Sequence, residues 1–242
     1  MTDARQPDFR RARSAEQREE RRRTILAAAA ELLEEMPVGD VSLRELARRV
    51  GLSKTNVVRY FETREAVFFA LLNQSFDQWL DELPADLATA APPGPASPAS
   101  VTDALARSLA RRRLLCELLS SLGTELERNI TAETAREFKL IHTRAQARLA
   151  ALLREHLTAL TPAAARELVS TTILLTAGLW PFAHPSPAVA QAQQDPELAH
   201  TRVDFADRLS RALHITVTGL VRGSVRCTAD PRTPRSSRRP SR

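Results

Sequence analysis

The sequence predicts an all-α protein. Only seven of its 242 residues are glycine, and aromatic residues make up 5% of the chain. Alanine, leucine, arginine and glutamate, which favour helices, are abundant instead. Apolar residues recur at intervals of three and four in the long stretches, the spacing of one face of an α-helix. With 43% hydrophobic residues, the chain can also bury a sizeable core.

The first helix is predicted over residues 14–36. The segment SAEQ at 14–17 has the form of a capping box, and Pro37 ends the helix because its ring cannot continue the backbone ladder. Residues 1–17 are predicted to form a basic, flexible arm. Its Arg10, Arg11 and Arg13 could lie on phosphates or in a minor groove, or could simply be solvated.

Two short helices joined by a tight turn are predicted next. The segment SLRE at 42–45 is a second capping box and opens a helix over 43–50, which Gly51 ends. Ser53 caps a third helix over 54–60. Val57 and Phe61, one turn apart, would both point inward.

A longer fourth helix is predicted from a cap at Thr63 to residue 83, as a connector between two domains. Residues 84–99 hold five prolines among alanine and serine, a composition that predicts a loop or linker rather than a helix. The N-terminal domain would therefore span 18–64, and a larger helical domain would span 65–224 with this loop inside it.

The larger domain is predicted to be built from five further helices. After a capping box SVTD at 100–103, three apolar-periodic stretches cover 101–111, 112–128 and 131–159, the last with Thr131 as its N-cap. Pro162 would begin a helix to residue 180, and a final helix would run over 196–222 after another proline-rich loop. Residues 225–242, rich in Pro, Ser, Thr and Arg, are predicted to be a disordered basic tail.

Several classes of protein are disfavoured by composition. Cys116 and Cys227 are too few for a disulfide framework, and no secretory signal precedes them, so the sequence favours a reducing cytoplasm. The longest apolar stretch, residues 168–182, is too short and too polar to span a membrane. Five scattered histidines show no metal-binding spacing, so no metal is predicted. Without a phosphate loop or nucleophile elbow, we predict neither an enzyme nor a cofactor.

The net charge of +6 is unevenly distributed along the chain. Residues 1–24, 37–64 and 225–242 carry net charges of +3, +3 and +5, so the remaining residues together carry −5. A protein that recognises phosphates needs local positive potential rather than a positive average. The distribution therefore favours an N-terminal module that approaches DNA and an acidic body that does not.

Residues 42–61 have the form of a helix-turn-helix. In this motif the first helix braces the second, whose outward side chains enter a DNA major groove about 12 Å wide. The bracing face would carry Leu46, Ala47, Val50, Leu52, Val57 and Phe61. Lys54, Thr55, Asn56 and Arg59 remain on the outer face. Arg and Lys suit guanine, Asn suits adenine, and a Thr methyl can touch a thymine methyl.

Residues 21–72 resemble the DNA-binding module of the TetR family of bacterial repressors. The resemblance is carried by Ile25, Ala28, Ala29, Leu32 and Leu33, and by VSLRELA at 41–47, VGLSK at 50–54, YF at 60–61 and REAV at 64–67. It implies that Arg44 touches a base or the DNA backbone, and that Tyr60 and Arg64 hold phosphates. The implied DNA-binding set is Arg44, Ser53, Lys54, Thr55, Asn56, Arg59, Tyr60 and Arg64.

Two positions depart from the family pattern. Val58 stands where the family usually has a phosphate-contacting tyrosine, so one DNA anchor is missing. Pro37 and Val38 occupy a bend where many relatives have glycine, so the turn after the first helix must reverse differently.

The resemblance also implies an architecture for the larger domain. Helices five to eight would enclose a ligand cavity, and the last two long helices would pair with those of a second copy as a four-helix bundle. Cavity candidates are Cys116, Phe138, His142, Thr176, Trp180 and Phe182, although ordinary core packing is the commoner explanation for such residues.

The expected function is a one-component repressor that binds a pseudo-palindromic, double-stranded DNA operator as a homodimer. A small, largely apolar inducer of unknown identity would release it. The alternative is a constitutive or architectural DNA-binding protein without small-molecule control, in which no metabolite weakens operator binding.

Overall fold

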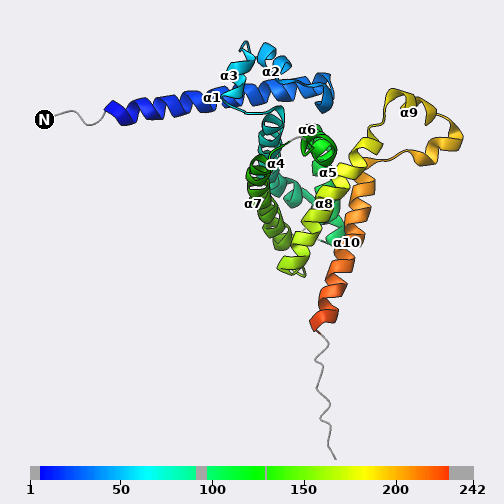
Figure 1. The fold of residues 1–242 in the computed structure, drawn as a ribbon. Helices are drawn as coiled ribbons and strands as arrows, with labels where there is room; N and C mark the ends of the chain where they lie inside the picture. The colour runs from blue at the N-terminus through cyan, green and yellow to red at the C-terminus, as the bar shows by residue number, and fades with distance from the viewer. Residues whose placement is uncertain (1–5, 91–96, 129, 229–242) are drawn as a thin grey trace, which may run out of the picture.

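The computed structural model describes residues 6–90, 97–128 and 130–228, and within them every regular element is helical. Figure 1 shows α1, α2 and α3 gathered at one end of the molecule, and α4 running from them into a bundle with α5–α8 and α10. No helix in the described ranges is long and apolar enough to cross a membrane. The all-α fold with an N-terminal helix-turn-helix is therefore confirmed.

The N-terminal domain is built from α1 (Gln6–Glu35), η1 (Val38–Asp40), α2 (Leu43–Arg49) and α3 (Lys54–Val58). Both predicted serine caps are present. Ser42 Oγ accepts a hydrogen bond from the Glu45 amide at 3.1 Å, and Ser53 Oγ accepts one from the Asn56 amide at 3.2 Å. Gly51 has a φ of 65°, the left-handed conformation that ends a helix and that glycine adopts without strain.

The first helix is longer than predicted. It begins at Gln6, so Ser14 lies inside it rather than at its cap, and residues 6–17 belong to a helix rather than to a flexible arm. The physical reason is helix propagation. Once the buried turn around Ile25 and Ala29 has nucleated the helix, extending it by each further Arg, Glu, Gln or Ala costs little free energy. The predicted position of Arg10, Arg11 and Arg13 on DNA stays untested.

The larger domain begins with α4 (Arg64–Ala90), which packs on α5 (Pro98–Ala110) and α7 (Ala132–His156). Trp79 is buried in α4, and its Nε1–H donates to Ser108 Oγ on α5 at 3.0 Å. Between α5 and α7 lie α6 (Arg113–Ser121) and η2 (Leu122–Leu126), a single π-helical turn that breaks the helix predicted over 112–128. The predicted Thr131 cap of α7 is confirmed.

The proline-rich loop is shorter than predicted. Pro84 lies inside α4, which continues to Ala90 because Leu83 and Leu87 are both buried and hold the helix on either side of the exposed proline. Ser97, rather than Ser100, caps α5 by accepting from the Ser100 amide at 3.1 Å. Residues 91–96 lie outside the described residues.

The C-terminal helices also differ from the prediction in detail. Pro181 lies inside α8 (Pro162–Ala183), and the following proline-rich segment contains α9 (Pro187–Ala192). The helix predicted over 196–222 is divided into η3 (Pro196–Thr201) and α10 (Phe205–Thr228), since the Asp204 carboxylate accepts from the Asp207 amide and opens a new helix. Of the predicted basic tail, residues 225–228 are helical, and 229–242 lie outside the described residues.

The two domains approach each other closely at η1 and η2. A Cβ added to Gly39 would lie only 2.8 Å from Glu125 Oε2, a glutamate of the π-helical turn. Because this atom is the end of a flexible glutamate side chain, it can turn aside to admit a small side chain at position 39.

Candidate nucleic-acid interface

The third helix carries one polar face and one buried face. Val57 and Phe61 are fully or almost fully buried, and Leu46 and Ala47 of α2 are buried with them. Lys54, Thr55, Asn56 and Arg59 are exposed, as is Arg44 on α2. The sequence thus placed these side chains on the correct faces, and α3 presents donors and acceptors of the kind that base edges in a major groove recognise.

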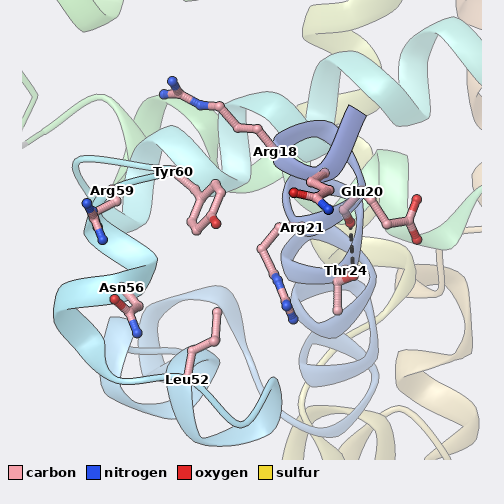
Figure 2. A pocket seen from close by; sticks show the side chains of 9 residues that line it. Arg18, Glu20, Arg21, Thr24, Leu52, Asn56, Arg59 and Tyr60 are labelled. Atoms are coloured by element: carbon pink, nitrogen blue, oxygen red, sulfur yellow. Dashed lines mark hydrogen bonds between the residues drawn. The ribbon is translucent and has the colours of Figure 1, made fainter. Parts of the chain in front are cut away.

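A cleft of about 860 Å³ separates α1 from the α2–α3 unit, and we call it the DNA-side cleft. Figure 2 shows Arg21 on α1 facing the wall that carries Leu52, Asn56 and Tyr60. Gln17, Arg18 and Arg59 also line it. Three arginines and one glutamate, Glu20, line the cleft, and the excess of two positive charges is local positive charge of the kind that phosphates require.

Arg18 and Arg21 were missed by the sequence interpretation, which considered only more N-terminal arginines as an arm. The available signal was spacing, because Gln17, Arg18, Arg21 and Thr24 recur at three to four residues along α1 and therefore share one face. The sequence does not show that this face is turned toward α3, because its direction depends on how α1 packs against the rest of the domain.

The end of α3 is fixed to α1 by Arg22. Its Nη1 donates to the Tyr60 carbonyl at 2.7 Å, and its guanidinium carbon lies 4.2 Å from the centre of the Phe61 ring. The contact combines a charge-assisted hydrogen bond with a cation–π interaction. Arg22 therefore positions Tyr60, which is half-buried at the edge of the cleft.

Arg64, which the resemblance implied as a phosphate contact, has several partners within the chain. Its Nη1 lies within hydrogen-bond distance of the carbonyls of Val38, Gly39 and Val41, at 3.0 to 3.3 Å, and its Nε donates to Glu65 Oε1 at 3.1 Å. The guanidinium thus satisfies the carbonyls of the bend at η1. Its implied contact with a DNA phosphate stays a prediction.

We expect Arg64→Ala to lower the free energy of unfolding by about 1–3 kcal/mol, because three carbonyls and a carboxylate lose a charged donor. Thermal or urea unfolding followed by circular dichroism measures the change. Arg59→Ala, an exposed arginine five residues away, serves as the matched control and should leave stability unchanged. Unaltered stability in Arg64→Ala together with weaker DNA binding would instead restore the phosphate role.

The predicted cavity residues fall into three environments. Cys116 is buried in α6, donates weakly to the Leu109 carbonyl, and has a pKa that burial raises to about 12. Trp180 is buried and packs against the buried Phe205 and the exposed His184. Phe182 is 68% exposed, so its prediction as a cavity residue is wrong within this chain. The helical period puts it on the outer face of α8, opposite Trp180.

Phe138, His142 and Thr176 are buried in the body. The Phe138 ring stacks on Phe69 at 4.4 Å between centroids and on His142 at 5.2 Å. Neither ring nitrogen of His142, nor the Thr176 hydroxyl, has a hydrogen-bond partner in the described part of the chain, and burial lowers the pKa of His142 to about 4. Buried polar groups without partners are uncommon and point to a ligand or to water.

The N-terminal module and the helical body define a class, the helix-turn-helix DNA-binding regulators of transcription. Residues 25–71 match the bacterial regulatory proteins of the tetR family, and residues 73–223 match the tetracyclin repressor-like C-terminal domain. The chain therefore belongs to the TetR family.

Curated relatives match only in the N-terminal part. The regulator RutR of Escherichia coli strain K12 is 35% identical over 65 residues, which cover 27% of this chain and 31% of RutR. EthR of Mycobacterium tuberculosis strain H37Rv is 38% identical over 60 residues, which cover 25% of this chain and 28% of EthR. The match thus spans less than a third of each relative.

Solved structures match over most of the chain at low identity. A TetR transcriptional regulator from Rhodococcus sp. RHA1 has a TM-score of 0.52 and 22% identity, over 84% of this chain and 96% of the other. FadR from Bacillus subtilis, in complex with stearoyl-CoA, has a TM-score of 0.50 and 15% identity, over 80% and 96%. These likenesses establish the fold.

Proposed function

We propose that this protein is a cytoplasmic repressor that binds a pseudo-palindromic operator as a homodimer and is released by a small, largely apolar ligand. The observation that carries the proposal is the division of α3 into an outer face of Lys54, Thr55, Asn56 and Arg59 and an inner face clamped by α1 and α2. Such a helix is held rigidly enough to read base edges.

The surface of α8 and α10 supports the homodimer. Leu174 and Phe182 on α8 and Ile215 on α10 are between 66% and 70% exposed, which is unusual for large apolar side chains on neighbouring helices. Gly178 and Gly219 lie on the same two helices, and a Cβ at either would meet nothing within 4 Å in its own chain. A second copy could therefore approach this face closely. Two-fold pairing would set the recognition helices about 34 Å apart, one turn of DNA.

The unpartnered polar atoms of His142 and Thr176 support ligand binding within the body. His142 packs against Phe76 of α4 and Phe138 of α7, and Thr176 is buried on α8, so a mostly apolar ligand with one or two polar groups would suit the body. FadR of B. subtilis was solved in complex with stearoyl-CoA, of which only the acyl chain is apolar, and 15% identity transfers no specificity. Release requires that the ligand bind the DNA-incompetent conformation more tightly than the competent one.

We expect Arg44→Ala and Arg59→Ala each to weaken operator binding by about 1–3 kcal/mol if the side chain reads a base. The operator is first obtained by selection from random double-stranded DNA, and affinity is then measured by gel-shift titration. Arg113→Ala on α6, an exposed arginine in the body, is the matched control and should bind normally. Unchanged affinity in both test variants, with helical content intact, would reject the proposed recognition surface.

The ligand is sought by screening metabolites for release of the selected operator. Release by a mostly apolar compound supports the repressor mechanism. Operator binding that no compound weakens would instead favour a constitutive or architectural DNA-binding protein.

A further inference from the structure

A second cleft, of about 330 Å³, lies where the N-terminal domain meets the body, and we call it the junction cleft. Val58, Arg59 and Phe61 line it from the recognition helix and the segment after it. From the body it is lined by Phe69 and Asn73 of α4 and by Phe138 and Ile141 of α7. It therefore opens between the part that would touch DNA and the part that would sense a ligand.

The side chain of Asn73 is the first observation that points to a ligand in this cleft. Its side chain is only 8% exposed, it lines the cleft, and its Oδ1 has no hydrogen-bond partner among the described residues. A buried acceptor without a donor is costly, so a molecule that supplies a donor here would gain the full value of the hydrogen bond.

Part of the cleft wall beside Asn73 is apolar, although charged and polar side chains line the rest. The stacked rings of Phe69 and Phe138 line it, and Val58 and Ile141 are 39% and 41% exposed at its sides. Val58 is the position where the family pattern has a phosphate-contacting tyrosine, so in this chain an apolar side chain lines the cleft instead. These four side chains give the cleft one apolar side, against which an apolar ring system can lie.

Charge at the cleft favours an anion. Arg18, Arg22 and Arg59 line it together with Glu62 and Glu137, which leaves an excess of one positive charge. Arg22 is already engaged by the Tyr60 carbonyl and the Phe61 ring. Arg18 and Arg59, both exposed, are therefore the arginines available to a carboxylate.

Three residues line both clefts: Arg18, Arg59 and Tyr60. A molecule in the junction cleft that draws Arg18 and Arg59 toward its own acidic group removes positive charge from the DNA-side cleft. It also occupies the space between the recognition helix and α7. Binding of this molecule and of the operator would therefore oppose each other, by the same factor in both directions.

We propose that the junction cleft is an effector site for a small aromatic acid that also carries a hydrogen-bond donor, and that occupancy of this site weakens operator binding. The proposal rests on the proposed function as a DNA-binding repressor, and adds to it a site at the junction of the N-terminal domain and the body. The aromatic rings lie against Phe69, Phe138 and Val58, the donor meets Asn73 Oδ1, and the carboxylate faces Arg18 and Arg59.

The test uses the full chain and the fluorescent probe 6-hydroxy-2-naphthoate, with 2-naphthoate as the matched probe that lacks the hydroxyl donor. Titration without DNA should show the hydroxylated probe binding roughly three- to tenfold more tightly, the usual worth of one hydrogen bond. Asn73→Leu should bind the two probes equally. Ala70→Phe, which fills the cleft from α4, should bind neither.

Thr176→Val is the matched control, because it removes an unpartnered polar atom from the body instead of the cleft, and it should bind both probes as the unaltered protein does. Saturating probe should weaken binding of the selected operator at least about fivefold, and this effect should vanish in Ala70→Phe.

The inference is overturned if the unaltered protein binds neither probe, or if Asn73→Leu and Ala70→Phe bind both as before. If only Thr176→Val lost the ability to bind the probes, the probes would bind in the body, and this result would also overturn the inference. Because the titration contains no DNA, these results are independent of operator binding. A protein that binds the probe as expected but selects no operator would instead contradict the proposed function.

Discussion

Replacing Ile215 by arginine is expected to convert the protein from a dimer to a monomer and to weaken operator binding by roughly 10²–10⁴-fold, the gain that two linked binding modules provide over one. Ile215 is 66% exposed in the single chain, so the substitution should change the stability of the monomer by no more than about 0.5 kcal/mol. At a closely packed two-fold interface, however, it would bring two unpaired charges out of water. Sedimentation and gel-shift titration measure the two effects.

Leu198→Arg provides the matched control, because Leu198 is also an exposed apolar residue but lies on η3, away from α8 and α10. It should leave both the mass and the DNA affinity unchanged. If Ile215→Arg remained dimeric with full affinity, the α8–α10 face would not be the dimer interface, and the proposed half-site geometry would lose its support.

Acidification from pH 7 to pH 4 is expected to lower the free energy of unfolding, with roughly 3 kcal/mol of the loss arising from His142. Burial lowers the pKa of His142 from 6.5 to about 4, and the lysine at position 139 acts in the same direction. Below pH 6.5 the His142 imidazole is therefore protonated in the unfolded chain, whereas in the folded chain it stays neutral until the pH approaches 4. His142 therefore leaves the free energy of unfolding unaffected above pH 6.5, lowers it progressively as the pH falls from 6.5 to 4, and lowers it little further below pH 4.

Urea unfolding at a series of pH values measures this contribution as the difference between the unaltered protein and His142→Leu. The variant should lack the loss between pH 6.5 and 4, since leucine binds no proton. His200→Leu, an exposed histidine on η3, should follow the unaltered protein. Parallel pH profiles for His142→Leu and the unaltered protein would show that His142 is protonated in the folded state and is not sequestered in the core.

The helix-turn-helix was predictable because its signals are local. Ser42 and Ser53 each cap a helix through an amide three residues ahead, and Gly51 ends α2 by adopting a left-handed conformation. The inward positions of Val57 and Phe61 follow from the helical period alone. These relationships are contained within about twenty residues, so the sequence pattern determines them with little help from the rest of the fold.

The borders of the longer helices were less predictable, because competing signals were weighed without knowledge of packing. Pro84 was expected to end α4, yet burial of Leu83 and Leu87 carries the helix past it. Ser14 was expected to begin α1, yet the helix extends back to Gln6. In both cases tertiary contact or helix propagation outweighed a local breaker or cap.

The sequence by itself determined the all-helical class, the recognition helix and which of its side chains face outward, since these depend on neighbours along the chain. Tertiary structure alone decided the roles of residues whose partners are distant in sequence. Arg64 donates to carbonyls 23 to 26 residues away, and Phe182 lies on an exposed face. Asn73, Phe138 and Val58 line one cleft. No periodic pattern in the sequence encodes these long-range contacts, because they depend on the angles at which whole helices cross and pack.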